Sequence, residues 1–180
     1  MKENILIIAG FGGQGVMLMG QVLATAAMIE DKHSTWLPSY GPEMRGGTAN
    51  CTVVISEEMI GSPIADTPTS VIAMNIPSLL KFEEKLSPEG LLIINSSVVD
   101  REPSRKDIQV AKIDANKIAE EIGNLRVANM VVLGAYVEKT GLISMESIEK
   151  AFERKLTGKK AKLIDMNTKA VKAGMEAVRN

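Results

Sequence analysis

A glycine-rich turn near the N-terminus constrains the fold of this chain more than any other feature of its sequence. The turn, GFGGQG at 10–15, has glycine at the first, third and sixth positions, as in the pattern G-x-G-x-x-G. The apolar, β-branched run at 4–9 precedes it and predicts a buried strand. Apolar residues at helical spacing follow over 14–29. A strand, a glycine turn and a helix in this order indicate the first unit of an open α/β sheet.

The same turn is a candidate anion site, because glycines let the backbone approach a ligand and a helix start presents free N–H groups. Its candidate residues are Gly10, Gly12, Gly13, Gln14 and Gly15. The dinucleotide fingerprint also needs an acid at the end of the second strand, where this chain has Leu-Pro-Ser at 37–39. No Lys-Ser or Lys-Thr pair follows the turn, so it is not a P-loop. An anion site and a purely structural turn therefore both stay open.

The rest of the chain alternates between strands and helices at first and is helical towards its end. We predict strands over 34–37, 48–56, 70–75, 91–95 and 109–113, and helices over 75–86, 114–122, 127–139, 145–156 and 163–178. Asn75 and Asp114 are the predicted N-caps of two of these helices. The fold class is therefore α/β: a three-layer α/β/α single domain over 1–180 with an open sheet and a helical C-terminal part. We expect the sheet to be mixed, because the segment after Gly46 lacks a helix before its neighbours.

Composition excludes several kinds of site. A structural zinc site needs four Cys or His ligands and an iron–sulfur cluster generally needs four thiolates, whereas this chain has one cysteine, Cys51, and one histidine, His33. We expect Cys51 to be a buried residue on a strand. The net charge of −1 argues against a nucleic-acid partner, and no run of 18 apolar residues predicts a membrane span. We expect a soluble, cytoplasmic protein.

A second segment, the predicted loop over 38–47, combines turn formers with aromatic, apolar and charged residues. Its candidate site residues are Tyr40, Gly41, Glu43, Arg45, Gly46 and Gly47. One interpretation is a cluster that covers the sheet edge, with Glu43 paired to Arg45. The other is a contact surface, in which the Arg45 guanidinium binds a carboxylate or phosphate with two hydrogen bonds. We favour the contact surface.

These two segments carry a family resemblance. GFGGQGVMLMGQVLA (10–24), followed by WLPSYGPEMRGGTANCTVVIS (36–56), resembles the gamma subunit of 2-oxoacid:ferredoxin oxidoreductases. The form PSYGPEMRGGTANC is most similar to the 2-oxoglutarate branch. In the later half, Asn129 with Leu133 and Gly134 is also similar to the family, less specifically.

The resemblance implies a subunit of a complex that decarboxylates a 2-oxoacid oxidatively, passes electrons to ferredoxin and forms acyl-coenzyme A. It implies that thiamine diphosphate, magnesium and the iron–sulfur clusters are held by partner alpha and beta subunits, with a ferredoxin-like delta subunit as a further candidate partner. This chain is expected to bind none of these cofactors alone and to be inactive alone. The two candidate loops are expected to face the alpha subunit or the approach of coenzyme A.

Other functions stay open at this point. The chain could be a free-standing nucleotide-binding module that uses the glycine turn, or a structural adaptor with no ligand. Within the family, it could serve a complex for pyruvate, for branched-chain 2-oxoacids or for indolepyruvate.

Overall fold

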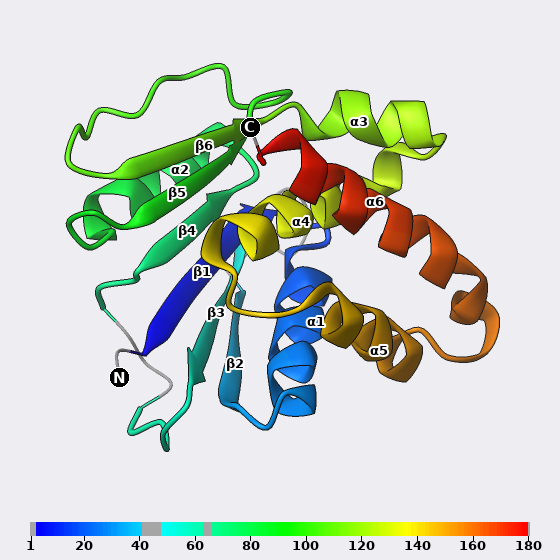
Figure 1. The fold of residues 1–180 in the computed structure, drawn as a ribbon. Coiled ribbons are helices and arrows are strands. Elements are labelled where there is room, and N and C mark those ends of the chain that lie inside the picture. The colour runs from blue at the N-terminus through cyan, green and yellow to red at the C-terminus, as the bar shows by residue number, and fades with distance from the viewer. Residues whose placement is uncertain (1–2, 41–47, 63–65, 180) are drawn as a thin grey trace.

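The computed structural model describes residues 3–40, 48–62 and 66–179, with the side chain of Tyr40 excepted. One mixed sheet of six strands, in the order β2-β3-β1-β4-β5-β6, is its centre (Figure 1). The strands are β1 (Asn4–Phe11), β2 (His33–Tyr40), β3 (Thr48–Ser56), β4 (Ser70–Ala73), β5 (Leu91–Asn95) and β6 (Gln109–Ile113). β1, β4, β5 and β6 run parallel, and β3 is antiparallel to both β1 and β2.

Helices cover both faces of this sheet. They are α1 (Val16–Ile29), α2 (Ile76–Phe82), α3 (Ala115–Ile122), α4 (Ala128–Thr140), α5 (Met145–Lys155) and α6 (Ile164–Ala177), with short 3-10 turns η1 (Glu83–Lys85), η2 (Leu125–Val127) and η3 (Gly158–Leu163). Figure 1 shows α2 behind the sheet and the other helices in front of it. The predicted fold class, a three-layer α/β/α domain with an open, mixed sheet and a helical C-terminal part, is confirmed.

The central strands are buried on both faces, so their side chains alternate between two cores. Ile8 and Ile72 belong to the larger core beneath α1 and α4, whereas Ile7 and Val71 belong to the smaller core beneath α2. The apolar run of β1 therefore supplies both layers.

Two glycines let α4 and α6 pack with their backbones in contact. A Cβ atom at Gly134 would lie 2.0 Å from the Val171 carbonyl oxygen, and one at Gly174 would lie 1.9 Å from the Val131 carbonyl oxygen. Because both neighbours are backbone atoms, only glycine fits at this crossing.

The structure corrects the prediction for the second strand. We expected a strand over 34–37 followed by an irregular loop from Pro38, but β2 continues to Tyr40, with Pro38 opposite Cys51. A proline is tolerated there because β2 lies at the sheet edge and pairs on one side only. Residues 38–40 are therefore part of the sheet rather than of a loop.

Of the two predicted helix N-caps, one is confirmed and one is wrong. The Asn75 side chain accepts a hydrogen bond from the Ser78 N–H at 2.8 Å, so its predicted capping of α2 is confirmed. α2 ends earlier than predicted and continues as η1. The predicted capping of α3 by Asp114 is wrong, because this side chain makes no cap hydrogen bond. Among the described residues, no helix is both long enough and apolar enough to cross a membrane.

Candidate functional site

The glycine turn lies where the sheet divides its helices between two faces. β1 and β4 are parallel neighbours, so their carboxyl ends meet at the same edge of the sheet. α1 follows β1 onto one face and α2 follows β4 onto the other. Ligands of open α/β sheets bind in the crevice at such a point. Topology therefore places the candidate site at this edge, which we call the carboxyl edge.

Gln14 closes the glycine turn. Its Oε1 accepts a hydrogen bond from the Phe11 N–H at 2.7 Å and one from Asn75 Nδ2 at 3.3 Å. Its Nε2 donates to the Met74 carbonyl oxygen at 2.9 Å. The side chain thus joins the ends of β1 and β4, and its polar atoms are occupied by the protein itself.

Three glycines of the turn are required by geometry. A Cβ atom on Gly10 would lie 2.7 Å from Gln14 Oε1. Gly15 has φ +74°, and a Cβ atom there would lie 2.3 Å from Asn129 Nδ2, which donates to the Gly15 carbonyl oxygen at 3.3 Å. Gly13 has φ +98° with open space where a Cβ would be. The structural role predicted for the turn is therefore present whether or not the turn also binds a ligand.

A pocket of about 250 Å³ opens beside the turn. Gly13 and Gln14 line it together with residues from distant parts of the chain, among them Asn95, Asn116, Arg126 and Asn129. Asn95 ends β5, Asn116 lies in the first turn of α3, and Asn129 lies in the first turn of α4. Among the described residues, the lining combines amides with one cation and contains no Asp, Glu, His or Cys. This composition suits binding and offers no group for proton transfer near neutral pH.

Hydrogen bonds hold the far side of the pocket in place. Asn95 Nδ2 donates to Asn116 Oδ1 at 3.1 Å, and Asn95 Oδ1 accepts from the Ser97 N–H at 3.3 Å. The Ser97 hydroxyl donates to the Asp114 carboxylate and accepts from the Asn116 N–H. Asp114 therefore fixes the start of α3 through Ser97, which explains why it does not cap the helix directly.

Apolar side chains stand exposed along the same edge. Phe11, Val98 and Leu125 expose 36%, 40% and 50% of their surface, and Val98 and Leu125 line the pocket. Apolar groups gathered around a polar pocket are typical of a surface that meets another protein.

The second predicted segment begins and ends at this edge. Tyr40 is the last residue of β2, Thr48 is the first of β3, and Thr48 pairs with Phe11 of the glycine turn. Gly41, Glu43, Arg45, Gly46 and Gly47 lie outside the described residues. The structure therefore brings the two ends of this segment to the glycine turn.

Sequence reasoning missed most of the pocket. Asn95, Asn116 and Arg126 were not singled out, because each is a common surface residue with no local motif. A usable signal was present: Asn95 ends a predicted strand, and the carboxyl ends of parallel strands share one edge.

The lone cysteine and histidine form no reactive pair. Cys51 is buried on β3, as predicted, and burial raises the pKa of its thiol to about 12. His33 is exposed at the start of β2, opposite Ser56. Within the described residues, no three Cys, His, Asp or Glu side chains form a group that could hold a metal ion.

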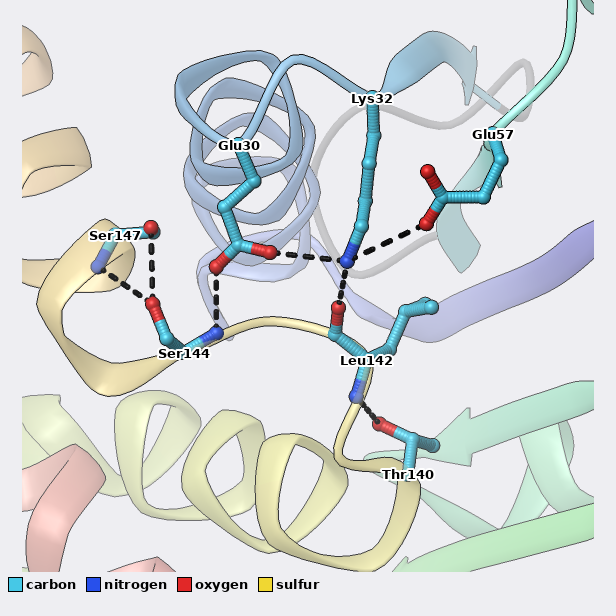
Figure 2. A network of polar contacts seen from close by, with 7 residues as sticks. All are labelled: Glu30, Lys32, Glu57, Thr140, Leu142, Ser144 and Ser147. Carbon is cyan, nitrogen blue, oxygen red and sulfur yellow. Dashed lines mark hydrogen bonds and ion pairs between the residues drawn. The ribbon is translucent and has the colours of Figure 1, made fainter.

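A charged network lies at the opposite end of α1 (Figure 2). Glu30 accepts from the Ser144 N–H at 2.7 Å and from Lys32 Nζ at 2.9 Å. Lys32 Nζ also donates to the Leu142 carbonyl oxygen at 2.6 Å and lies 3.9 Å from a Glu57 carboxylate oxygen. The network joins the turn after α1 to the connection between α4 and α5.

The surroundings of Glu30 favour its ionised form. Burial by itself raises the pKa of this carboxyl, but the hydrogen bonds from Ser144 and Lys32 outweigh it and lower the pKa to about 2. Glu30 precedes β2, and its carboxylate belongs to this network.

Comparison with known proteins identifies relatives over most of the chain. The family model described as pyruvate ferredoxin/flavodoxin oxidoreductase matches residues 5–177. Ketoisovalerate oxidoreductase subunit VorA of Methanothermobacter thermautotrophicus is 43% identical over 96% of this chain, which spans 36% of that protein's length. 2-Oxoglutarate synthase subunit KorC of Methanothermobacter marburgensis is 37% identical over 99% of this chain and 97% of its own length.

A solved structure agrees with these relatives. The keto/oxoacid ferredoxin oxidoreductase gamma subunit of Geobacter sulfurreducens superposes with a TM-score of 0.84 at 31% identity, covering 97% of this chain and 98% of that one. The match extends over the glycine turn, the sheet and the helical C-terminal part.

Proposed function

Since this chain belongs to the pyruvate ferredoxin/flavodoxin oxidoreductase family, we propose that it serves as the gamma subunit of a 2-oxoacid:ferredoxin oxidoreductase. Such a complex decarboxylates a 2-oxoacid oxidatively, transfers the electrons to ferredoxin and forms acyl-coenzyme A. The observation that carries the proposal is the family match over residues 5–177, which includes both candidate loops. Alpha and beta subunits are the proposed partners, with a ferredoxin-like delta subunit as a further candidate.

The residues of this chain do not fit the redox and thiamine cofactors of such a complex. An iron–sulfur cluster generally needs four thiolates, and the single thiol, Cys51, is buried with a raised pKa. The described residues also offer no cluster of acids to hold the magnesium of thiamine diphosphate. In the proposal these groups belong to the partner subunits, and this chain contributes binding and shape.

We assign the carboxyl edge to the contact with the alpha subunit and to the approach of coenzyme A. The start of α1 has no side-chain cap, so its backbone N–H groups are suited to an anion such as a phosphate. Arg126 adds a positive charge to the pocket lining. The exposed Phe11, Val98 and Leu125 supply apolar contact area for a protein partner.

The segment bracketed by Tyr40 and Thr48 belongs to the same proposed surface. The proposal gives Arg45 the contact with an anionic group, of coenzyme A or of the alpha subunit. It is supported by the position of the segment's two ends beside the glycine turn. Tyr40, Gly41, Glu43, Gly46 and Gly47 are the accompanying candidates.

We propose 2-oxoglutarate as the substrate of the complex. The form PSYGPEMRGGTANC supports this choice, as does the KorC relative, which the chain matches over nearly the whole of both sequences. The more identical VorA relative, named for ketoisovalerate, is matched over about a third of its length.

Reconstitution of the complex tests the proposal. The chain is co-expressed with candidate alpha and beta subunits, and viologen reduction is measured with 2-oxoglutarate, ketoisovalerate, pyruvate and indolepyruvate, each with coenzyme A. We expect activity only when all subunits are present, and the highest kcat/KM with 2-oxoglutarate. A chain that fails to assemble and instead binds NAD, FAD or ATP alone would support a free-standing nucleotide-binding module.

Substitution of Arg45 tests the second loop. Arg45→Ala should raise the KM of the complex for coenzyme A or weaken its assembly by about tenfold, the value of one charge-assisted contact. Lys85→Ala, which removes an exposed positive charge in η1, is the control and should change neither quantity. Wild-type assembly and wild-type KM in Arg45→Ala would remove this loop from the site.

A further inference from the structure

The connection between α5 and α6 carries the densest positive charge of the chain. Five of the nine residues over 154–162 are Lys or Arg and none is acidic. The five are Arg154, Lys155, Lys159, Lys160 and Lys162, and all are exposed. Figure 1 shows this connection, in orange, at the outer end of the helical layer and away from the sheet. We call residues 154–162 the basic segment.

Intramolecular contacts do not account for this charge. No cation of the basic segment forms an ion pair with a described residue, whereas Lys32, Lys112, Lys150 and Lys172 elsewhere each have a carboxylate partner. Arg154 and Lys155 lie in the last turn of α5, where a positive charge stabilises the helix dipole. Lys159, Lys160 and Lys162 lie beyond that turn in η3, so the helix does not explain them.

We propose that the basic segment is part of the docking surface for a small, acidic electron-carrier protein. This inference rests on the proposed function, because a complex of this kind delivers electrons to a separate carrier. The chain as a whole has a net charge of −1, so without the segment's five cations the remainder is distinctly acidic. An approaching acidic protein is therefore attracted to this one region and repelled by the rest.

The lysine content favours a brief encounter over a permanent subunit contact. Lysine is depleted from the buried centres of protein interfaces, because fixing its long side chain and removing water from its charge are both costly. Exposed lysines raise the rate of association and leave the complex sensitive to salt. Electron-transfer partners meet through small interfaces of this kind.

Other anionic partners fit less well. Single-stranded nucleic acid is bound by basic grooves with aromatic side chains for base stacking, and the basic segment contains no aromatic residue. Attachment to a membrane surface needs an apolar face beside the charges, and Leu156, its one large apolar residue, is buried. An acidic protein surface remains the partner that the segment suits.

Charge reversal in the reconstituted complex tests this proposal. The variant Lys159→Glu/Lys160→Glu is assayed with 2-oxoglutarate, first with methyl viologen and then with an acidic ferredoxin as acceptor. We expect unchanged viologen reduction and a KM for ferredoxin raised about tenfold, with a weaker dependence on salt. The matched control Lys85→Glu/Lys117→Glu, also at exposed lysines without a described ion pair, should keep the wild-type KM.

Each other outcome has a distinct meaning. A wild-type KM for ferredoxin in the Lys159→Glu/Lys160→Glu variant overturns the docking proposal while the function of the complex stands. Loss of assembly or of viologen reduction also overturns it, because the segment would then be a subunit interface. A KM for ferredoxin that rises equally in both double variants would show that the net charge of the complex sets this KM, and this result would also overturn the docking proposal. A wild-type complex without viologen reduction would instead count against the proposed function.

Discussion

The two ends of α1 are fastened to the rest of the molecule by different chemistry. At its N-terminal end, the contacts are hydrogen bonds of neutral amides: Gln14 joins the ends of β1 and β4, and Asn129 donates to the Gly15 carbonyl oxygen. At its C-terminal end, the ionised pair of Glu30 and Lys32 joins the helix to the connection between α4 and α5. One helix therefore has an uncharged attachment at the carboxyl edge and a charged attachment opposite.

Because of this difference, the surface proposed for binding and the contacts whose stability depends on acid lie at opposite ends of α1. An amide network keeps the same hydrogen bonds across a wide pH range, so the attachment of α1 at the carboxyl edge does not depend on pH. Of the residues that the structure describes, Arg126 is then the one charged residue that lines the pocket. The charged attachment stands away from the edge, where its response to acid changes stability without changing the proposed binding surface.

The largest expected effect concerns the backbone at Gly15. Gly15→Ala should lower the free energy of unfolding by about 3 kcal/mol, because it combines a left-handed backbone with a clash against Asn129 Nδ2. Gly13→Ala shares the left-handed backbone but has open space around it, and should cost about 1 kcal/mol. Urea unfolding of the two variants checks this. Equal losses of unfolding free energy in the two variants would show that the clash with Asn129 does not contribute.

The second largest effect tests whether the stability from the charged attachment depends on pH. Glu30→Gln should cost about 2 kcal/mol at pH 7, because Lys32 and the Ser144 N–H lose a charged acceptor in a largely buried site. The folded pKa of about 2 lies below the ordinary 4.5. The stabilisation is therefore present above pH 4.5 and is lost as the pH falls towards 2. Urea midpoints of both proteins should converge over this window.

Glu146→Gln is the matched control for that experiment. Glu146 forms an exposed ion pair with Lys150 on α5, and exposed pairs contribute little. Its urea midpoint should follow the wild type at every pH. If the difference in urea midpoint between Glu30→Gln and the wild type stays constant down to pH 2, the role of the charged attachment is contradicted.

The smallest effect belongs to the neutral attachment. Gln14→Ala should cost about 1 kcal/mol, because the Phe11 N–H and the Met74 carbonyl lose their partner at a site that water can reach. The loss should be the same at pH 7 and pH 3, since no ionisable group is involved. A loss that changes with pH would remove the distinction between the two ends of α1.

The sequence predicted the parts of this molecule that local patterns encode. The strand–turn–helix unit around Gly10, the capping by Asn75 and the predicted helix over 127–139 all follow from residue types within a few positions. The mixed sheet followed from the missing helix between its second and third strands. Each of these features depends on backbone preferences that act over short distances.

The features that could not be predicted from the sequence depend on contacts between distant segments of the chain. Pro38 lies in a strand because β2 is at an edge, which is a property of the whole sheet. The clash that requires glycine at 134 comes from α6. The pocket unites Asn95, Arg126 and the glycine turn, which meet through topology alone.

We propose that this chain supports catalysis without housing the cofactors that perform it. The most direct measurement adds the purified chain back to a complex of the partner subunits prepared without it, and follows methyl viologen reduction with 2-oxoglutarate and coenzyme A. We predict no reduction by the chain alone, little by the incomplete complex, and restored turnover on mixing. Reduction by the isolated chain, or full turnover by a complex that lacks it, would contradict the account.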